Sequence, residues 1–482
     1  MRWPGSTARR QGEALPEGAR RSYWLREALA DDPGEACPPL ADHRDADVLI
    51  VGGGYTGLWT AYFLTERAPG IDVVVLEQDI CGGGPSGRNG GFVTAWWDEL
   101  PGLVAHHGRD GALAACRAVA SAVTAIGDWC GTHGVDAWYR RAGHLTTACS
   151  EAQRGSWARS VNMARDLGVP DEYVEVAADE VRRRCDSPVF LDGALMRDGA
   201  TVQPARLARG LRRVLLERGV RIFEGSPVRR VRGGPMVEAE TPGGRVRAAR
   251  GVVAAGAWAA GWPWFERTLA VWTSYIVLSA PAPDLLERIG WTGGECITDE
   301  RTTVQYFRTT PDGRVAFGGG GGRVASAKRI GRRFERDARS IERAAAGFRR
   351  LFPSFASVPI EDAWGGPIDV APWHVPFYGT LPGGRLHHGF GYSGNGVAPS
   401  FVGGRILASL CLDLDDDDAR LPMAHADPRP FPPEPIRTLG AHVVREAIVR
   451  TEQAEDEGRR PPALARFVAR LPRRMGYELG PE

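Results

Sequence analysis

The stretch DADVLIVGGGYTGLWTAYFL, residues 45–64, is an apolar run that is interrupted by glycines and then continues with helical spacing. Residues 47–51 predict a short buried strand, and the apolar residues from position 58 onward recur as on one face of a helix. Gly52, Gly54 and Gly57 fit G-x-G-x-x-G, which permits a tight turn, close approach to a pyrophosphate and close helix–strand packing. The stretch therefore predicts a dinucleotide-binding unit with phosphates at the helix N-terminus.

The next strand supports this interpretation over that of a purely structural turn. A single G-x-G-x-x-G says little in a chain with 62 glycines. However, IDVVVLE, residues 71–77, predicts a second buried strand that ends in Glu77, 20 residues after Gly57. An acidic residue at this place accepts hydrogen bonds from the ribose hydroxyls of an adenine dinucleotide. We therefore expect Glu77 to bind the adenosine ribose.

The composition of the whole chain sets limits on its partners and its compartment. With 482 residues it is long enough for two or three domains, and its net charge of +1 predicts neither a nucleic-acid nor a membrane partner. The eight cysteines lie far apart, with no spacing typical of a metal site, so we expect no metal. Scattered thiols and the lack of a continuous apolar run of 18 residues favour a cytoplasmic protein without a membrane span.

Three further stretches carry a family resemblance. QDICGGGPSGRNGGFV follows Glu77, GVVAAGAWA spans 251–259, and GFGYSGNGVAPSFVGGRIL spans 389–407. Together they resemble the D-amino-acid-oxidase-like (DAO) superfamily of FAD oxidoreductases, and most closely its γ-glutamylputrescine oxidoreductase and putative aminophosphonate oxidoreductase group. The resemblance implies that the cofactor is FAD, with the first stretch along the pyrophosphate and flavin and the last aiming a helix N-terminus at the flavin ring.

The resemblance also implies the fold class and the FAD-binding residues. We expect an α/β protein with a Rossmann-like FAD-binding domain of the glutathione-reductase type and a second, antiparallel-sheet substrate domain. The expected division is an N-terminal segment 1–44, an FAD-binding domain 45–98, 190–262 and 360–412, a substrate domain 99–189 and 263–359, and a C-terminal helical extension 428–482. The candidate FAD-binding residues are Gly52, Gly54, Tyr55, Thr56, Gly57, Glu77, Gln78, Ser86, Gly87, Arg88, Asn89, Gly90, Gly91, Val228, Ala255, Gly256, Gly391, Tyr392, Gly394, Asn395, Gly396 and Val397.

Departures from related branches narrow the chemistry. A second G-x-G-x-x-G begins at Gly389, but no strand with a terminal acid follows it, so no nicotinamide site is predicted. Amino-acid oxidases of the superfamily carry a carboxylate-binding arginine in W-x-G-x-R-P, whereas Trp364 here opens WGGPID. Residues 364–395 contain no cysteine, to which sarcosine-oxidase relatives attach flavin, so we expect non-covalent FAD.

The resemblance implies oxidation of a C–N bond in a small amine. A hydride would pass to flavin N5, and the imine would be hydrolysed to an aldehyde; the electron acceptor is O2 or unknown. Tyr306 and Arg308 alternate on one predicted strand and are candidates for the substrate side, where Arg308 could bind a phosphonate or carboxylate. A sheet-face tyrosine and a surface arginine are equally plausible. Trp96 and Trp97 could hold an ammonium group, although core packing is the favoured interpretation.

Two other functions stay open at this point. The first is a flavoprotein reductase supplied by NAD(P)H, which the missing second dinucleotide fingerprint disfavours. The second is a non-catalytic protein in which FAD only stabilises the fold or a partner contact.

Overall fold

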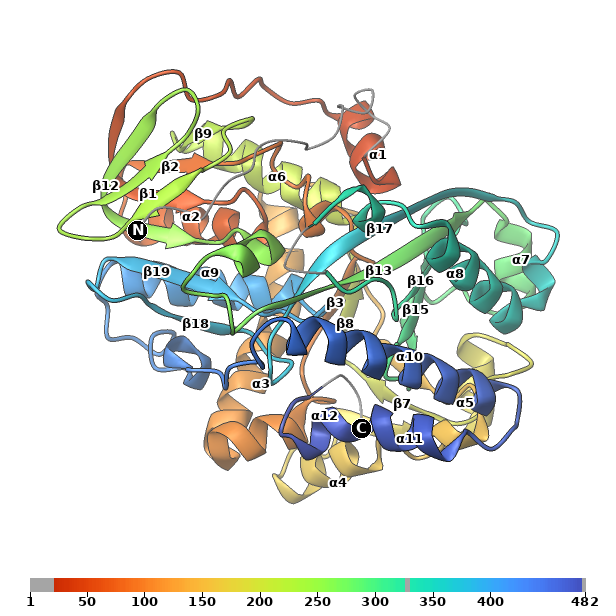
Figure 1. Cartoon of the computed structure of the whole chain (residues 1–482). Helices are drawn as coiled ribbons and strands as arrows, with labels where there is room; N and C mark the ends of the chain where they lie inside the picture. The colour runs from red at the N-terminus through yellow and green to blue at the C-terminus, as the bar shows by residue number, and fades with distance from the viewer. Residues whose placement is uncertain (1–20, 326–329, 479–482) are drawn as a thin grey trace.

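Three β-sheets organise the chain, of which the structure, a computed structural model, describes residues 21–325 and 330–478. The first sheet lies beside the second, and helices cover both (Figure 1). The strands of the first sheet are β10 (Arg230–Arg232), β11 (Val237–Glu240), β12 (Arg245–Val253), β1 (Arg44–Val51), β2 (Val73–Leu76), β9 (Arg221–Phe223), β18 (Phe377–Thr380) and β19 (Leu386–Phe390). Strands β19, β12, β1, β2 and β9 run parallel to their neighbours in that order, as the predicted Rossmann-like unit requires.

Both faces of the parallel strands are buried, which explains their continuous apolar sequences. Val48 and Ile50 of β1 pack with the helices α2 and α9 on one face, whereas Leu49 and Val51 belong to a separate core on the other. The helices on the first face are α2 (Tyr55–Arg67), α6 (Pro204–Glu217) and α9 (Val397–Cys411). The predicted strand–turn–helix of residues 45–64 is therefore present as β1, a glycine turn and α2.

The second sheet has eight strands and is mostly antiparallel. In order across the sheet they are β17 (Ile360–Val370), β13 (Ala270–Ser279), β16 (Val315–Gly319), β15 (Gln305–Thr309), β14 (Cys296–Asp299), β5 (His144–Thr147), β7 (Gly193–Met196) and β6 (Tyr173–Val176). One face packs on α8 (Ala338–Leu351) through Phe307, Phe317 and Phe348. The opposite face carries the side chains of Tyr306 and Arg308, so these two side chains point away from α8.

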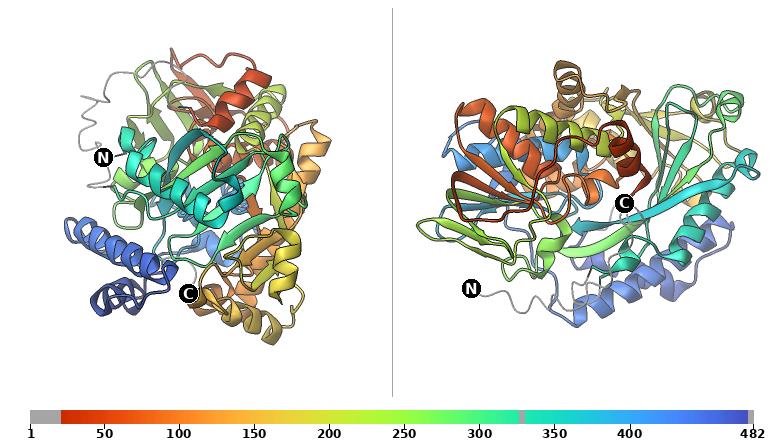
Figure 2. Two further views of the ribbon diagram at one scale, coloured as in Figure 1. Left: turned by 90° about the vertical axis from the view of Figure 1, so that its right-hand side faces the viewer. Right: turned by 90° about the horizontal axis from the view of Figure 1, so that it is seen from above.

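The remaining elements connect the two sheets or lie outside them. A third, small sheet contains β3 (Phe92–Thr94), β8 (Gly199–Thr201) and β4 (Arg140–Arg141). The other helices are α1 (Tyr23–Asp31), α3 (Leu100–Thr132), α4 (Ala158–Asp166), α5 (Ala178–Arg184), α7 (Pro283–Arg288), α10 (Ile436–Asp456), α11 (Ala463–Ala469) and α12 (Leu471–Arg474). The last three form the expected helical extension at one side of the molecule, drawn in blue in both views of Figure 2.

The fold class is as expected, and two strands differ from the predicted domain division. Strands β7 and β17 fall within ranges that the sequence assigned to the FAD-binding domain, yet they pair inside the second sheet. Strand β17 pairs with β13 over nearly its whole length, from Ala270–Val370 to Ser279–Ile360. The other boundaries stay predictions.

Helix α3 (Leu100–Thr132) is long and apolar enough to cross a membrane, by length and composition alone. It bends at Gly108, whose φ is 72°, and its buried residues share one core with α2 and α9. Its apolar face is therefore explained by packing inside the protein.

Candidate functional site

The glycine turn between β1 and α2 has no room for side chains. Gly52 has a φ of 117°, and a Cβ there would lie 2.3 Å from the carbonyl oxygen of Ala254. A Cβ on Gly57 would lie 2.0 Å from the Gly52 oxygen. Gly54, the residue that precedes α2, has no side chain to cap the helix, so the positive end of the helix dipole can face an anionic ligand.

Glu77 lies at the carboxyl end of β2, next to this turn. Its carboxylate accepts hydrogen bonds from the backbone N–H groups of Gly53 at 2.7 Å and Asp79 at 2.9 Å. Burial raises the pKa of Glu77 to about 7, and Glu77 forms no ion pair within residues 21–325 and 330–478. A partly buried carboxylate with acceptor capacity left over fits the ribose hydroxyls of an adenine dinucleotide.

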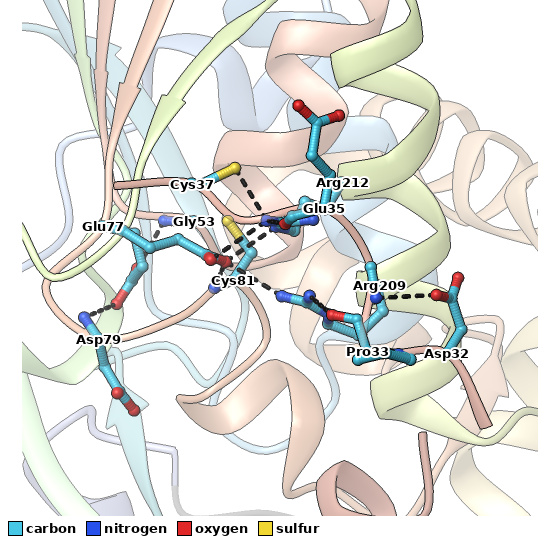
Figure 3. A network of polar contacts seen from close by, with 12 residues as sticks. Asp32, Pro33, Glu35, Cys37, Gly53, Glu77, Asp79, Cys81, Arg209 and Arg212 are labelled. Atoms are coloured by element: carbon cyan, nitrogen blue, oxygen red, sulfur yellow. Dashed lines mark hydrogen bonds and ion pairs between the residues drawn. The ribbon is translucent and has the colours of Figure 1, made fainter. Parts of the chain in front are cut away.

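A network of charged side chains contacts the loop that follows Glu77 (Figure 3). The carboxylate of Glu224 accepts from Cys81 N at 2.8 Å, from Arg209 at 3.0 Å and from Arg212 at 3.0 Å. Arg212 also donates to the Glu35 carbonyl and contacts the Cys37 thiol. The sequence analysis missed these residues, because none of them belongs to a local motif.

The loop 86–91 is fixed by its own side chains. Ser86 accepts from Tyr55 N at 2.8 Å, which links the loop to the start of α2. Arg88, only 7% exposed, donates to the carbonyls of Gly83 at 2.9 Å and Gly365 at 3.2 Å. The Asn89 side chain accepts from Gly91 N at 2.7 Å. The side chains of Ser86, Arg88 and Asn89 therefore shape the loop, and a ligand beside it would meet mainly backbone.

The segment 391–397 reaches the same place from the far end of the chain. The hydroxyls of Thr56 and Tyr392 are 2.8 Å apart, and Thr94 donates to the side chain of Asn395 at 3.2 Å. Gly396 caps α9, which begins at Val397, again without a side-chain acceptor. The N-termini of α2 and α9 and the loop 86–91 are thus brought together, as a site for one extended cofactor requires.

Asp369 holds this segment in place and was not predicted. Its Oδ2 accepts from Gly391 N at 2.7 Å, while its carbonyl accepts from Ser393 N at 2.9 Å. Burial raises the pKa of Asp369 to about 6. The sequence shows Asp369 as the only acidic residue of WGGPID, and this residue could have been selected as a candidate.

The remaining predicted FAD residues range from buried to exposed. Ala255 N would be 3.3 Å from a Cβ on Gly52, and Gly256 has a φ of 51°. Val228 and Ala255 are half-buried against the same hydrophobic core, whereas Gln78 is exposed. Gly87 and Gly90 lie in the loop described above, and a Cβ on Gly90 would be 2.9 Å from the Tyr306 ring.

Tyr306 and Arg308 share one face of β15 but have different surroundings. The Tyr306 hydroxyl lies 2.8 Å from Ser274 Oγ, and burial raises its pKa to about 12. Arg308 is 2% exposed and donates to the carbonyls of Val202 and Thr309, with its guanidinium 5.7 Å from the Trp24 ring. Arg308 is therefore engaged by main chain and an aromatic ring, which gives its predicted anion-binding role no support.

Further polar side chains share the face of Tyr306, and the sequence analysis did not select them. Thr298 stands opposite both Tyr306 and Thr146 in the strand register. His144 contacts Thr298 Oγ1 through Nε2 at 2.8 Å, and burial lowers the pKa of His144 to about 4. Trp97 is 1% exposed and lies in the core, as the favoured interpretation predicted. Side chains alternate between the two faces of a strand, so HLTT (144–147) and CITD (296–299) could have indicated that His144, Thr146 and Thr298 share one face.

Known proteins resemble this chain in sequence and in fold. A sequence model described as "FAD dependent oxidoreductase" (DAO) matches residues 47–410. Gamma-glutamylputrescine oxidoreductase of Escherichia coli K12 is 28% identical over 423 residues, which covers 85% of this chain and 93% of that protein. The probable oxidoreductase OrdL of Rhizobium meliloti is 29% identical over 406 residues, which covers 81% and 88%.

Among solved structures, glycine oxidase from Geobacillus kaustophilus is similar with a TM-score of 0.63 and 20% identity. The match covers 77% of this chain and 96% of the glycine oxidase. This similarity shows that the two proteins share a fold.

Proposed function

Because the chain belongs to the DAO family of FAD-dependent oxidoreductases and acts on C–N bonds, we propose that its substrate is a small amine rather than a common α-amino acid. FAD, when bound, supplies the flavin that accepts a hydride from the carbon next to the amine, and water hydrolyses the resulting imine to an aldehyde. The first support is the name of the Escherichia coli relative, which describes an amine substrate. The second is WGGPID, where related amino-acid oxidases carry a carboxylate-binding arginine.

The observation that carries the cofactor assignment is the convergence of four separate segments. In this proposal Glu77 accepts the ribose hydroxyls and the N-terminus of α2 faces the pyrophosphate. The backbone of residues 86–91 lies along the ribityl chain and the ring, and the N-terminus of α9 stabilises negative charge on the flavin. Tyr306, packed against Gly90, faces the substrate from the second sheet.

One observation supports a cytoplasmic location of the enzyme, whereas the identity of the electron acceptor stays open. All eight cysteines are free thiols, which supports our proposal of a cytoplasmic enzyme. Among the described residues no group of three or more His, Cys, Asp or Glu side chains could hold a metal ion. The electron acceptor is O2 or another oxidant.

Anaerobic reduction of the flavin tests the proposal. The holoenzyme is mixed with putrescine, γ-glutamylputrescine, 2-aminoethylphosphonate, N-methyl-2-aminoethylphosphonate, sarcosine, glycine, D-alanine and NADPH in separate runs, and the flavin absorbance is followed. We expect bleaching by at least one of the first four and none by the amino acids. Bleaching by sarcosine, glycine or D-alanine alone would contradict an amine substrate, and bleaching by NADPH alone would restore the reductase alternative.

A further inference from the structure

Three consecutive carbonyls of the loop 86–91 accept hydrogen bonds from buried side chains that lie outside the loop. The donors are Ser22 Oγ, Trp364 Nε1 and Trp24 Nε1, and the acceptors, in the same order, are the carbonyls of Gly87, Arg88 and Asn89. The three donor–acceptor distances are 2.5, 2.8 and 3.1 Å. We call Ser22, Trp24 and Trp364 the carbonyl clamp.

The two tryptophans of the carbonyl clamp are fixed by packing on several sides. Trp24 is 0% exposed and Trp364 is 2% exposed, and their ring centroids lie 5.6 Å apart in an edge-to-face arrangement. The guanidinium of Arg308 lies over the Trp24 ring at 5.7 Å, and the Trp24 carbonyl accepts from the Gln203 side chain at 2.7 Å. Neither indole can therefore turn away from its carbonyl without disturbing the core.

The hydrogen bond from Trp24 fixes the orientation of one peptide unit, which joins Asn89 to Gly90. This peptide bond is trans, and in a trans peptide the C=O and the N–H point in opposite directions. Because the Asn89 carbonyl points toward Trp24, the Gly90 N–H points away from Trp24. Without this hydrogen bond the unit could turn, since glycine accepts backbone dihedral angles that other residues rarely adopt.

The Gly90 N–H is the donor that the loop leaves open for a ligand. The N–H groups of Arg88 and Asn89 both donate to the Pro85 carbonyl at 3.1 Å, and the Gly91 N–H donates to the Asn89 side chain at 2.7 Å. The Gly90 N–H, in contrast, has no acceptor among the described residues, and Gly90 is partly exposed. Its hydrogen-bond acceptor is therefore solvent or a ligand.

We propose that the carbonyl clamp directs the Gly90 N–H toward the flavin and thereby raises the reduction potential of the bound FAD. The inference rests on the proposed placement of the loop 86–91 along the flavin. A fixed N–H donor stabilises the negative charge of reduced flavin more than it stabilises the neutral oxidised ring. Trp24 and Ser22 are positioning residues, because they act on the flavin only through the loop backbone. Both precede residues 47–410, which the family model matches, so the family match alone does not assign them this role.

Trp24→Phe tests the carbonyl clamp, because it keeps an aromatic ring in the core and removes the indole N–H. We expect the preference of the site for reduced over oxidised flavin to fall about tenfold, which lowers the two-electron reduction potential by about 30 mV. The potential is measured in the holoenzyme by equilibration with a reference dye during slow reduction. An unchanged potential in Trp24→Phe that has bound FAD would overturn the inference.

Trp291→Phe is the matched control. Trp291 is 1% exposed, and its indole N–H donates to the Glu295 carbonyl at 3.4 Å in the core that the second sheet shares with α8. Both variants remove one buried N–H donor and should lose stability to a similar extent. Trp291→Phe should nevertheless keep the potential of the wild type. An equal change of potential in the two variants would overturn the inference, since a loosened core would then explain both.

A measurement on the wild type covers the case in which Trp24→Phe loses FAD or does not fold. Hydrogen exchange in the loop 86–91 is followed in apoprotein and holoenzyme by mass spectrometry with fragmentation to single residues. FAD should slow exchange of the Gly90 amide about tenfold or more, because this N–H gains an acceptor. The Gly91 amide, which already donates to Asn89, is the internal control and should change less. Equal exchange of the Gly90 amide in both forms would overturn the inference.

These measurements keep the inference separate from the proposed substrate. Neither the reduction potential nor hydrogen exchange requires an amine. If no amine reduced the flavin while the potential shifted in Trp24→Phe, the proposed function would fail and the carbonyl clamp would stand. If amines reduced the flavin while the potential stayed unchanged, the reverse would hold.

Discussion

The carboxylate of Glu77 accepts a hydrogen bond from Gly53 N at 2.7 Å, so the acid that ends β2 is tied directly to the glycine turn that precedes α2. The two predicted parts of the dinucleotide site therefore form one unit. Any change at Glu77 acts on the shape of the turn as well as on the ribose contact.

Replacement of Glu77 tests this unit. Glu77→Gln should weaken FAD binding about tenfold or more, because hydrogen bonds to a charged group contribute about 1.5–3 kcal/mol. The dissociation constant is measured by quenching of flavin fluorescence as the apoprotein is reconstituted. Glu66→Gln, on the exposed side of α2, is the control and should bind FAD normally. Unchanged affinity in Glu77→Gln would refute the ribose assignment.

The raised pKa of Glu77 predicts pH-dependent binding of FAD. Burial raises this pKa to about 7, so the carboxyl group is largely protonated below pH 7 in the absence of the cofactor. Ribose hydroxyls donate to the ionised form, so FAD binding lowers the pKa and releases a proton. The affinity should increase as the pH rises from 6 to 8 and then level off. Titrations over this range should show the dependence in the wild type and its loss in Glu77→Gln.

Gly57 predicts a steric requirement at the start of α2. A Cβ would lie 2.0 Å from the Gly52 carbonyl oxygen, which belongs to the turn and cannot move freely. Gly57→Ala should lower the free energy of unfolding by about 1–3 kcal/mol and reduce FAD content. Gly131→Ala is a suitable control, because a Cβ there meets nothing within 4 Å, and alanine favours a helix. Thermal unfolding and absorbance at 450 nm give both readouts; equal behaviour of the two variants would contradict the packing argument.

Replacement of Arg308 should lower the stability of the fold rather than the affinity for substrate. Arg308→Met leaves the carbonyls of Val202 and Thr309 without a buried donor and should cost about 1–3 kcal/mol of folding free energy. Arg420→Met removes an exposed arginine and should have little effect on stability. If Arg308→Met kept its stability but lost affinity for 4-aminobutyrate, the anion-binding role would be restored.

The sequence predicted those parts of the site that depend on local spacing. The glycine turn and Glu77 lie within 26 residues of one another, and the apolar periodicity and the glycine spacing locate them without knowledge of the rest of the fold. The sequence placed residues 360–370 in the range of the FAD-binding domain, and their pairing with β13 in the second sheet could not be read from it, because this pairing joins segments about 90 residues apart and leaves no periodic signal. Asp369 and Glu224 were missed for a related reason, since each acts on backbone N–H groups from other segments.

The substrate side was harder to predict because strand alternation gives a face but not its surroundings. Tyr306 and Arg308 do share a face, yet Arg308 donates hydrogen bonds to the carbonyls of Val202 and Thr309 and lies over the Trp24 ring.

The hydrogen bond between Thr56 and Tyr392 joins residues that are 336 positions apart in the chain. During synthesis on the ribosome, the N-terminal glycine turn emerges long before the residues that complete its binding site. Tight capture of FAD must therefore wait until α9 has left the exit tunnel. A nascent chain that ends before Gly391 should remain colourless, whatever the flavin supply of the cell.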